Sequence, residues 1–349
     1  MKKKRHVNIP IFVPHIGCPH DCAFCNQKVI TGKPSFDISS IDIEVEKNLE
    51  YISSDVLPEI AFFGGSFTGI EKSLMISLLE KATQYVNMGK VSSIRLSTRP
   101  DYISGEILDI LSRYPVKTIE LGIQSTSESV LKASMRGHTL EDTVRACTLV
   151  REHGFDLVGQ MMLALPLSTL DSEIKTAEFI VSSGAVASRI YPTVVFSGTG
   201  LDTMMKKGEY IPISVEEAAR RSAIIYKIFA DNSVKVLRIG LCESDGLRSS
   251  EVCGGAYHPA LGEMALSEYY SLLIEEKISA HIDALSDISD KEIIITIPKN
   301  TLSAVIGQKG SARNKLYEKY SPSRIFYIED ESLGDNEVQI KIKEHNKCD

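Results

Sequence analysis

Three cysteines lie within eight residues near the N-terminus, as Cys18, Cys22 and Cys25 in the segment Cys-Pro-His-Asp-Cys-Ala-Phe-Cys. Cysteines crowded in this way in a chain without a secretory signal bind metal more often than they form disulfides. Three thiolates on one loop can bind three irons of a cubane cluster and leave the fourth iron open to an external ligand. The C-x3-C-x2-C spacing therefore predicts a 4Fe–4S centre with one exchangeable position.

Two other interpretations of this loop are weaker. A zinc site usually has four ligands, commonly as two C-x2-C pairs. His20 could serve as the fourth ligand, but it lies inside the same short loop and would strain a tetrahedral geometry. Three buried, unreactive cysteines are not expected at this density beside a proline and an aspartate.

Glycine and polar residues follow the next apolar segments. Phe63-Gly64-Gly65-Ser66-Phe67 contains a glycine pair, which would let the backbone come close to a ligand. Ser97, Gln124 and Gln160 lie on or at the end of later segments, and Arg136 precedes a predicted helix for which Thr139 is the expected N-cap. For any one of these polar residues the alternative is an ordinary hydrogen bond at a strand end.

Together these motifs resemble those of the radical S-adenosylmethionine (SAM) enzymes. The segments STRPDYI, IELGIQS, RGHT and RIYPTVVFSGTGL are similar to the radical SAM domain of the Elongator catalytic subunit, which modifies the wobble uridine of tRNA. The resemblance covers roughly residues 8 to 240. It implies that SAM chelates the open iron and that reduction yields a 5′-deoxyadenosyl radical. The SAM-binding residues it implies are Phe24, Gly64, Gly65, Ser66, Ser97, Gln124, Arg136 and Gln160, with Arg136 expected to pair with the SAM carboxylate.

The sequence departs from the Elongator pattern at three points. The Elongator loop is usually longer between its first two cysteines, and Ser97 stands where that family typically has glutamate. No acetyltransferase domain follows the barrel in this sequence, so the carboxymethyl product is not expected to carry over. The same core is more distantly similar to the oxygen-independent coproporphyrinogen oxidases.

The elements that must position these residues alternate between strands and helices. The expected strands are 9–14, 60–64, 93–98, 118–124, 157–163 and 188–195, and the expected helices are near 40–53, 71–86, 104–112, 139–152 and 171–182. Such alternation predicts an α/β fold with a parallel sheet, either a partial (β/α)6 barrel or a doubly wound sheet. The resemblance implies the TIM-like partial barrel of the radical SAM type. Functional residues should then lie at the C-terminal ends of the strands.

The remainder of the chain predicts an extension and a second, smaller domain. We expect the barrel core at about 8–240, a helical extension at 241–285 and a small α+β domain at 286–349, which begins with a linker at 286–290. In that last region the sequence predicts a strand, two helices and two further strands.

The segment IPKNTLSAVIGQKGSARNKL in the small domain resembles the KH domain, in which a G-x-x-G loop clamps single-stranded nucleic acid. Between Lys299 and Arg324 six basic residues stand against one acid. The predicted RNA-binding residues are Gly307, Gln308, Lys309, Gly310, Arg313 and Lys315. The alternatives are a plain helix–helix turn and a degenerate KH fold that contacts protein.

The composition narrows the function further. The net charge of −7 argues against a protein that binds nucleic acid through its overall charge, but not against a local basic patch. No apolar stretch is long enough to span a membrane, so we expect a cytoplasmic protein with no membrane or DNA partner. Tyr257 and His258 are candidate catalytic residues. Cys242 and Cys253 could bind a second cluster or have a redox role, but small-residue packing is the simpler interpretation.

The sequence thus predicts a radical SAM enzyme that holds a 4Fe–4S cluster and SAM, acts on RNA, with tRNA as the expected class, and needs an external electron donor. Two alternatives stay open. One is a radical SAM oxidoreductase that acts on a small molecule such as a porphyrinogen. The other is a non-catalytic iron–sulfur protein that binds RNA.

Overall fold

A parallel sheet of seven strands forms the centre of the protein. The computed structural model describes residues 7–13, 18, 22–25, 37–53, 55–241, 251–285 and 288–344. The strands lie in the order β1–β2–β3–β4–β5–β6–β8, and every neighbouring pair is parallel. Their bounds are β1 Asn8–Val13, β2 Glu59–Gly64, β3 Ser93–Thr98, β4 Val116–Gln124, β5 Asp156–Leu163, β6 Ala187–Pro192 and β8 Lys235–Ile239. The predicted partial barrel is confirmed.

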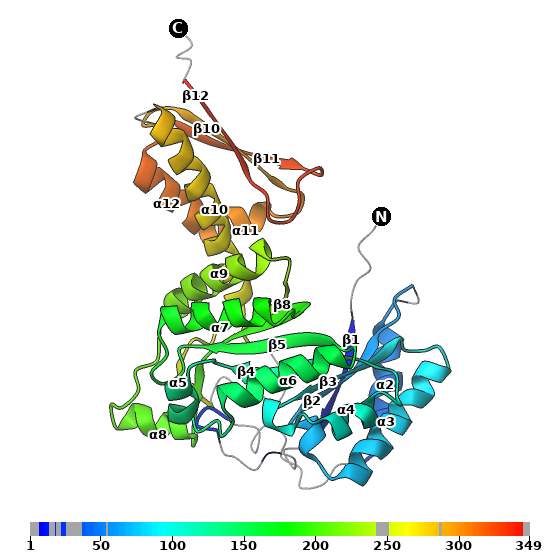
Figure 1. Cartoon of the computed structure of the whole chain (residues 1–349). Helices are drawn as coiled ribbons and strands as arrows, with labels where there is room; N and C mark the ends of the chain where they lie inside the picture. The colour runs from blue at the N-terminus through cyan, green and yellow to red at the C-terminus, as the bar shows by residue number, and fades with distance from the viewer. Residues whose placement is uncertain are drawn as a thin grey trace.

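Helices connect successive strands, as a parallel sheet requires (Figure 1). Their bounds are α2 Ser40–Tyr51, α3 Lys72–Asn87, α4 Gly105–Leu111, α5 Glu128–Ala133, α6 Leu140–Glu152, α7 Leu170–Ser182 and α9 Val215–Asp231. Side chains such as Leu78, Val150 and Ile180 are fully buried against the strands. Thr139 begins α6 in a capping box with Asp142, which confirms the predicted cap.

The last predicted strand of the barrel, 188–195, is divided in two. β6 ends at Pro192. The backbone N–H and the hydroxyl of Thr193, the next residue, both donate to the Leu163 carbonyl, at 3.0 and 2.6 Å. The following strand β7 (Val194–Phe196) leaves the main sheet and pairs antiparallel with β9 (Val252–Gly255). A short helix, α8 (Gly200–Lys206), follows β7.

A long helix, α10 (Leu261–Leu285), connects the barrel to the C-terminal part of the chain. It starts beside the end of β8 and packs along α9, where the rings of Tyr226 and Tyr269 meet edge to face at 4.7 Å. Figure 1 shows the small C-terminal unit standing to one side of the barrel, joined to it where α10 passes α9. Ile274 and Ile278 of α10 are buried in the core of that unit.

The C-terminal unit is a three-stranded sheet with helices on one face. β10 (Glu292–Pro298) lies between β11 (Arg324–Asp330), which is parallel to it, and β12 (Gln339–Lys343), which is antiparallel. α11 (Leu302–Ile306), a single 3-10 turn at 308–310 and α12 (Ser311–Tyr320) join β10 to β11. The predicted order of strands and helices is therefore present. Residues 286–287 of the expected linker lie outside the described residues.

No helix in the described part of the chain is long and apolar enough to cross a membrane.

Candidate active site at the mouth of the barrel

The cysteine loop is attached to the C-terminal end of the barrel by backbone hydrogen bonds. The Ala23 N–H donates to the Ser134 carbonyl at 3.0 Å, and the Leu201 N–H donates to the Ala23 carbonyl at 2.8 Å. Cys22 is buried, whereas Cys18 and Cys25 are half-buried. The loop is therefore fixed between the segment after α5 and the start of α8, with its thiols at the mouth of the barrel.

Two buried arginines face the Cys22 thiol. The Arg136 Nη1 lies 3.5 Å from the Cys22 Sγ, and the Arg99 Nη1 lies 3.8 Å from it. Arg99 is held by two bonds to the Asp101 carboxylate and by one to the Arg136 carbonyl, at 2.7 to 2.9 Å. Burial raises the pKa of the Cys18 thiol, and the positive charges of Arg136 and Arg99 oppose that rise. Both arginines therefore favour thiolates at this site.

The donor set fits a cubane cluster. Among the described residues, no three His, Cys, Asp or Glu side chains lie close enough together to hold a single metal ion. A cubane places each of three thiolates on a different iron, so its ligands need not converge on one point. A cluster with three thiolates is negatively charged, and the two buried guanidiniums supply the opposite charge. His20, the fourth ligand of the zinc alternative, lies outside the described residues.

The glycine pair after β2 lies directly beside this centre. Gly64 has a φ of 109°, and a Cβ at this position would lie 2.5 Å from the Val13 carbonyl oxygen of β1, so glycine is required. The Ser66 hydroxyl meets the Thr98 hydroxyl at 2.9 Å and accepts the Arg99 N–H. The Ser66 N–H faces Cys18 and stabilises its thiolate. The predicted residues Gly64, Gly65 and Ser66 are thus brought together with the cysteines.

The end of β4 carries Gln124, whose backbone lies in the left-handed region with a φ of 66°. Its Oε1 is buried and accepts no hydrogen bond from a described residue. Gly122, which sequence reasoning missed, makes room for its neighbours, because a Cβ there would lie 2.7 Å from the Arg136 Nη2 and 3.0 Å from the Gln124 Nε2. A glycine inside a strand was the available signal.

Ser97 and Gln160 make contacts within the protein. The Ser97 hydroxyl lies 3.4 Å from the Phe62 carbonyl, and the Gln160 Nε2 donates to the Glu120 Oε2 at 2.8 Å. Gln160 lies in the middle of β5, so it belongs to the interior of the barrel more than to its mouth.

A buried charge network surrounds Glu120, and sequence reasoning missed it. Glu120 is fully buried and bonds to Arg95 at 2.9 Å and to Arg189 at 2.7 Å, while Arg95 also bonds to Glu59 at 2.9 Å. Burial alone would raise the pKa of the Glu120 carboxyl, but the guanidiniums of Arg189 and Arg95 hold that pKa below its usual range. Two carboxylates, Glu59 and Glu120, are therefore matched by two guanidiniums, Arg95 and Arg189, so this network leaves no unpaired charge in the barrel interior.

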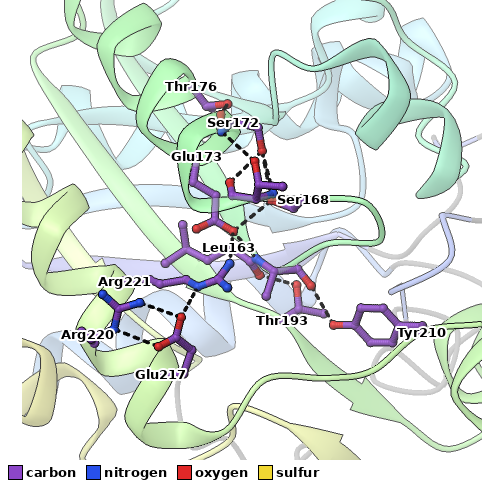
Figure 2. A network of polar contacts seen from close by, with 12 residues as sticks. Leu163, Ser168, Ser172, Glu173, Thr176, Thr193, Tyr210, Glu217, Arg220 and Arg221 are labelled. Atoms are coloured by element: carbon purple, nitrogen blue, oxygen red, sulfur yellow. Dashed lines mark hydrogen bonds and ion pairs between the residues drawn. The ribbon is translucent and has the colours of Figure 1, made fainter.

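The loop after β5 has an unusual backbone conformation, and Figure 2 shows polar contacts around it, among them that of Glu173 with Ser168. Ala164 and Leu167 have φ values of 57° and 64°, in the left-handed region that favours glycine. Glu173 Oε1 of α7 accepts the Ala164 N–H at 2.7 Å and the Ser168 hydroxyl at 2.9 Å. The Tyr210 hydroxyl donates to the Ala164 carbonyl at 2.7 Å. Both sides of the Ala164 backbone are thus fixed by buried side chains.

Tyr210 also connects this loop to the cysteine loop. It belongs to a small buried cluster with Ala23, Val195 and Leu201, and the half-buried Phe24 packs against that cluster. Tyr210 therefore joins the Ala164 carbonyl of the loop after β5 to the buried cluster that contains Ala23 of the cysteine loop.

Tyr257 and His258 lie in the turn after β9. His258 is exposed, and its Nδ1 accepts the Ala260 N–H at 3.1 Å within its own turn, while Tyr257 is half-buried. Cys253 is exposed on β9, and Cys242 lies outside the described residues.

The predicted RNA-binding residues lie far along the chain, around the turn between α11 and α12. Gly307 and Gly310 have φ values of 77° and 78°, and Gln308 and Lys309 between them are exposed. A Cβ on Gly307 would lie 2.8 Å from the Ser267 Oγ of α10.

Several basic residues of this region are paired. The Lys315 and Lys319 ammonium groups bind Glu268 and Glu275 of α10 at 2.5 and 2.6 Å, and Lys299 pairs with Glu331. No described residue forms an ion pair with Lys309 or Arg313, which are both exposed. Only part of the predicted basic patch is therefore unpaired within the described chain.

Comparison with known proteins identifies the family. The family model of the radical SAM superfamily matches residues 12–180, and that of the radical SAM C-terminal domain matches residues 186–271. A tRNA uridine(34) acetyltransferase of Methanocaldococcus infernus and the human Elongator complex protein 3 are each 32% identical over 40% of this chain. The match spans only 27% of the length of each of these relatives. An uncharacterised protein of Methanocaldococcus jannaschii is 29% identical over 60% of this chain and 67% of its own.

A solved structure supports the fold. The archaeal Elp3 of Methanocaldococcus infernus superposes with a TM-score of 0.60 at 20% identity, over 78% of this chain and 63% of that one. With its cysteine loop at the mouth of a partial barrel and both family matches, the chain belongs to the radical SAM superfamily, as an enzyme similar to Elongator whose cofactors are a 4Fe–4S cluster and SAM.

Proposed function

We propose that this enzyme cleaves SAM at its cluster and modifies a nucleoside of RNA, with tRNA as the substrate class. The observation that carries the proposal is the set of three cysteine thiols at the mouth of the barrel, with two buried arginines against Cys22 and the Gly64 turn beside Cys18. When bound and reduced by an external donor, the cluster would supply one electron to the SAM sulfonium, whose S–C5′ bond would break to give methionine and a 5′-deoxyadenosyl radical.

The protein's own residues bind and orient SAM in this proposal. The backbone of the Gly64–Gly65 turn, beside Cys18, would lie against the methionine part of SAM. The Nε of Arg136 is buried and has no hydrogen-bond partner among the described residues, so it can donate to the SAM carboxylate. The unpaired, buried Oε1 of Gln124 can accept a ribose hydroxyl.

The C-terminal unit is proposed to hold the RNA as a KH-like domain. Its two helices are joined by Gly307-Gln308-Lys309-Gly310, in which two exposed side chains stand between two glycines. Phosphates can approach this backbone and the N-terminus of α12, with Lys309 and Arg313 nearby. Lys315 would have to leave Glu268 to join them.

The direction of the helices supports this arrangement. Lys315 and Lys319 of α12 pair with Glu268 and Glu275 of α10 in the same order, so the two helices run in the same direction. The loop before α12 therefore lies near the start of α10, beside Ser267. Ser267 follows Leu261 by only six residues, about 9 Å of helix. Leu261 itself packs against Gly240 just after β8, at the end of the barrel that carries the cysteines.

The test is anaerobic incubation of the reconstituted, reduced enzyme with SAM and bulk tRNA, followed by mass analysis of the nucleosides. We expect 5′-deoxyadenosine and a nucleoside of changed mass that appears only with intact cysteines. Absence of SAM cleavage would overturn the enzymatic part of the proposal. If SAM is cleaved but added RNA neither increases the cleavage nor yields a nucleoside of changed mass, the RNA part is overturned.

A further inference from the structure

The two edges of the C-terminal sheet differ in how they are protected. The edge strand β12 exposes Lys341 and Lys343, and lysine on an edge strand discourages pairing with another chain. The other edge strand, β11, exposes Phe326 and Ile328, with 41% and 50% of their surfaces open to solvent. β11 thus has the composition of a strand that pairs with a further strand.

The hydrogen bonds of β11 show which of its backbone groups point away from β10. The Ile325 N–H donates to the Tyr317 hydroxyl at 3.2 Å, so it points away from β10. Because alternate residues of a strand present their backbone groups to the same side, those of Tyr327 and Glu329 also point outward. The side chains of Ile325 and Tyr327 pack into the core, and Phe326 and Ile328 lie on the opposite face, which the helices leave open.

The sequence of β11, Arg-Ile-Phe-Tyr-Ile-Glu-Asp, is complementary to itself when reversed. In an antiparallel pair centred on Tyr327, Arg324 lies opposite Asp330 of a second copy, and Phe326 lies opposite Ile328. Each of these pairs occurs twice by symmetry. Opposite charges and aromatic–β-branched neighbours are the cross-strand pairs that stabilise antiparallel sheets.

We propose that two copies of this chain associate through β11, as an antiparallel two-fold pair that joins their three-stranded sheets into one of six strands. The outward backbone groups agree with this register. Ile325 with Glu329, and Tyr327 with itself, become the hydrogen-bonded pairs, for which the Ile325 N–H leaves the Tyr317 hydroxyl and donates to the Glu329 carbonyl of the second copy. Phe326 and Ile328 then form the non-hydrogen-bonded pair, in which side chains come closest. The interface uses the same surface on both copies, as two-fold symmetry requires.

The charges favour a second copy over RNA as the occupant. β11 carries Arg324 at one end and Glu329 and Asp330 at the other, and Glu331 follows. A phosphate backbone along this edge would meet more acids than bases. A reversed copy of the strand instead places each end against its opposite charge.

The experiment measures the mass of the full-length holoenzyme by sedimentation over a range of concentrations. We expect a monomer–dimer equilibrium in the wild type and a monomer for Phe326→Lys, which places a charge in the centre of the interface. Arg324→Asp or Asp330→Arg alone should weaken the dimer about tenfold or more, because like charges then face each other twice. The double exchange, Arg324→Asp combined with Asp330→Arg, should return the dissociation constant of the dimer to within about threefold of the wild-type value.

The matched control is Lys341→Asp, the same change of charge on the other edge strand. It should leave the dimer unchanged, and the melting temperature of every variant should stay near that of the wild type. Asp330 also accepts the Ser332 N–H at 2.8 Å. Because Asp330→Arg and the double exchange both remove this bond, the dissociation constants of these two variants are compared with each other. A wild type that is monomeric at about 100 μM, or a double exchange that does not restore the dimer, overturns the proposal.

Discussion

Two clusters of cationic side chains, one at the mouth of the barrel and one on the C-terminal unit, are built in opposite ways. At the mouth of the barrel, Arg99 and Arg136 are buried, and they are fixed by the Asp101 carboxylate and by the carbonyl oxygens of Arg136 and Gly122. On the C-terminal unit, Lys315 and Lys319 are exposed and bind single carboxylates of α10. Exposed ion pairs contribute about 0–1 kcal/mol and exchange readily with solvent or ligand.

This difference shows which cationic side chains have one fixed position in the folded protein. A buried guanidinium without partners would be very costly, so the residues around Arg136 must hold it in one place. A surface lysine costs little in any position, so its partner in the structure says little about its partner in a complex. The barrel mouth is therefore a preorganised site, whereas the basic surface of α12 is adaptable.

The largest expected effect is that of Cys22→Ala. Removal of one of three thiolates should abolish the visible absorption of the reconstituted cluster and all SAM cleavage. Cys147→Ala is the matched control, because burial raises the pKa of the Cys147 thiol to about 11 and the residue lies in the core of α6. An intact cluster in Cys22→Ala would show that this thiolate is not a ligand.

Gly122→Ala should break the preorganised site without removal of any charge. The new methyl group would meet the Arg136 Nη2 at 2.7 Å and displace the guanidinium from Cys22. We expect SAM cleavage to fall about 100-fold, since misplacement by about 1 Å commonly has this effect, while iron content stays near the wild-type value. Gly105→Ala, at a position with open space, is the control. Unchanged cleavage would mean that Arg136 does not need its present position.

The adaptable surface is tested by two double variants of equal charge. Lys309→Ala with Arg313→Ala removes cations that pair with no described residue, and Lys315→Ala with Lys319→Ala removes cations that bind α10. The first should weaken RNA binding and lower the salt slope by about one unit for each phosphate that is no longer neutralised. The second should have a smaller effect on RNA binding. Equal effects would show that the α10 pairs open on binding.

The smallest expected effect is a change in acid stability at His138. Burial and the charge of Arg136 lower the pKa of His138 to about 3. The usual pKa of histidine is about 6.5. Below that pH the unfolded chain binds a proton at His138 that the folded chain does not bind, so the free energy of unfolding falls as the pH drops below about 6.5. At pH 5.5 the loss is about 1 kcal/mol. His138→Gln should therefore narrow the difference in melting temperature between pH 7.5 and 5.5, and an unchanged difference would contradict the assignment.

Much of the site could be predicted because its signals are local. Cys18, Cys22 and Cys25 share one loop, and the Gly64–Gly65 turn follows a strand, so their chemistry follows from their spacing. Alternation of apolar strands and amphipathic helices likewise predicts the parallel sheet, because only a helix can cover a crossover between parallel strands.

Other features depended on residues that are distant in the sequence. Glu120, Arg95 and Arg189 appear as ordinary charged residues in strands, and only the closure of the sheet brings them into one buried network. Ala164 adopts a left-handed backbone because Glu173 and Tyr210, from two other segments, bond to both of its sides.

By itself, the sequence determined the parallel barrel, the order of elements in the small C-terminal unit, and the crowding of three cysteines on which the cluster proposal rests. Only the tertiary structure decided which polar side chains face the thiols, which of the predicted basic residues are paired with α10, and that one edge of the small sheet remains open. The reason is that spacing fixes local geometry, whereas burial and charge pairing depend on which surfaces the fold brings together.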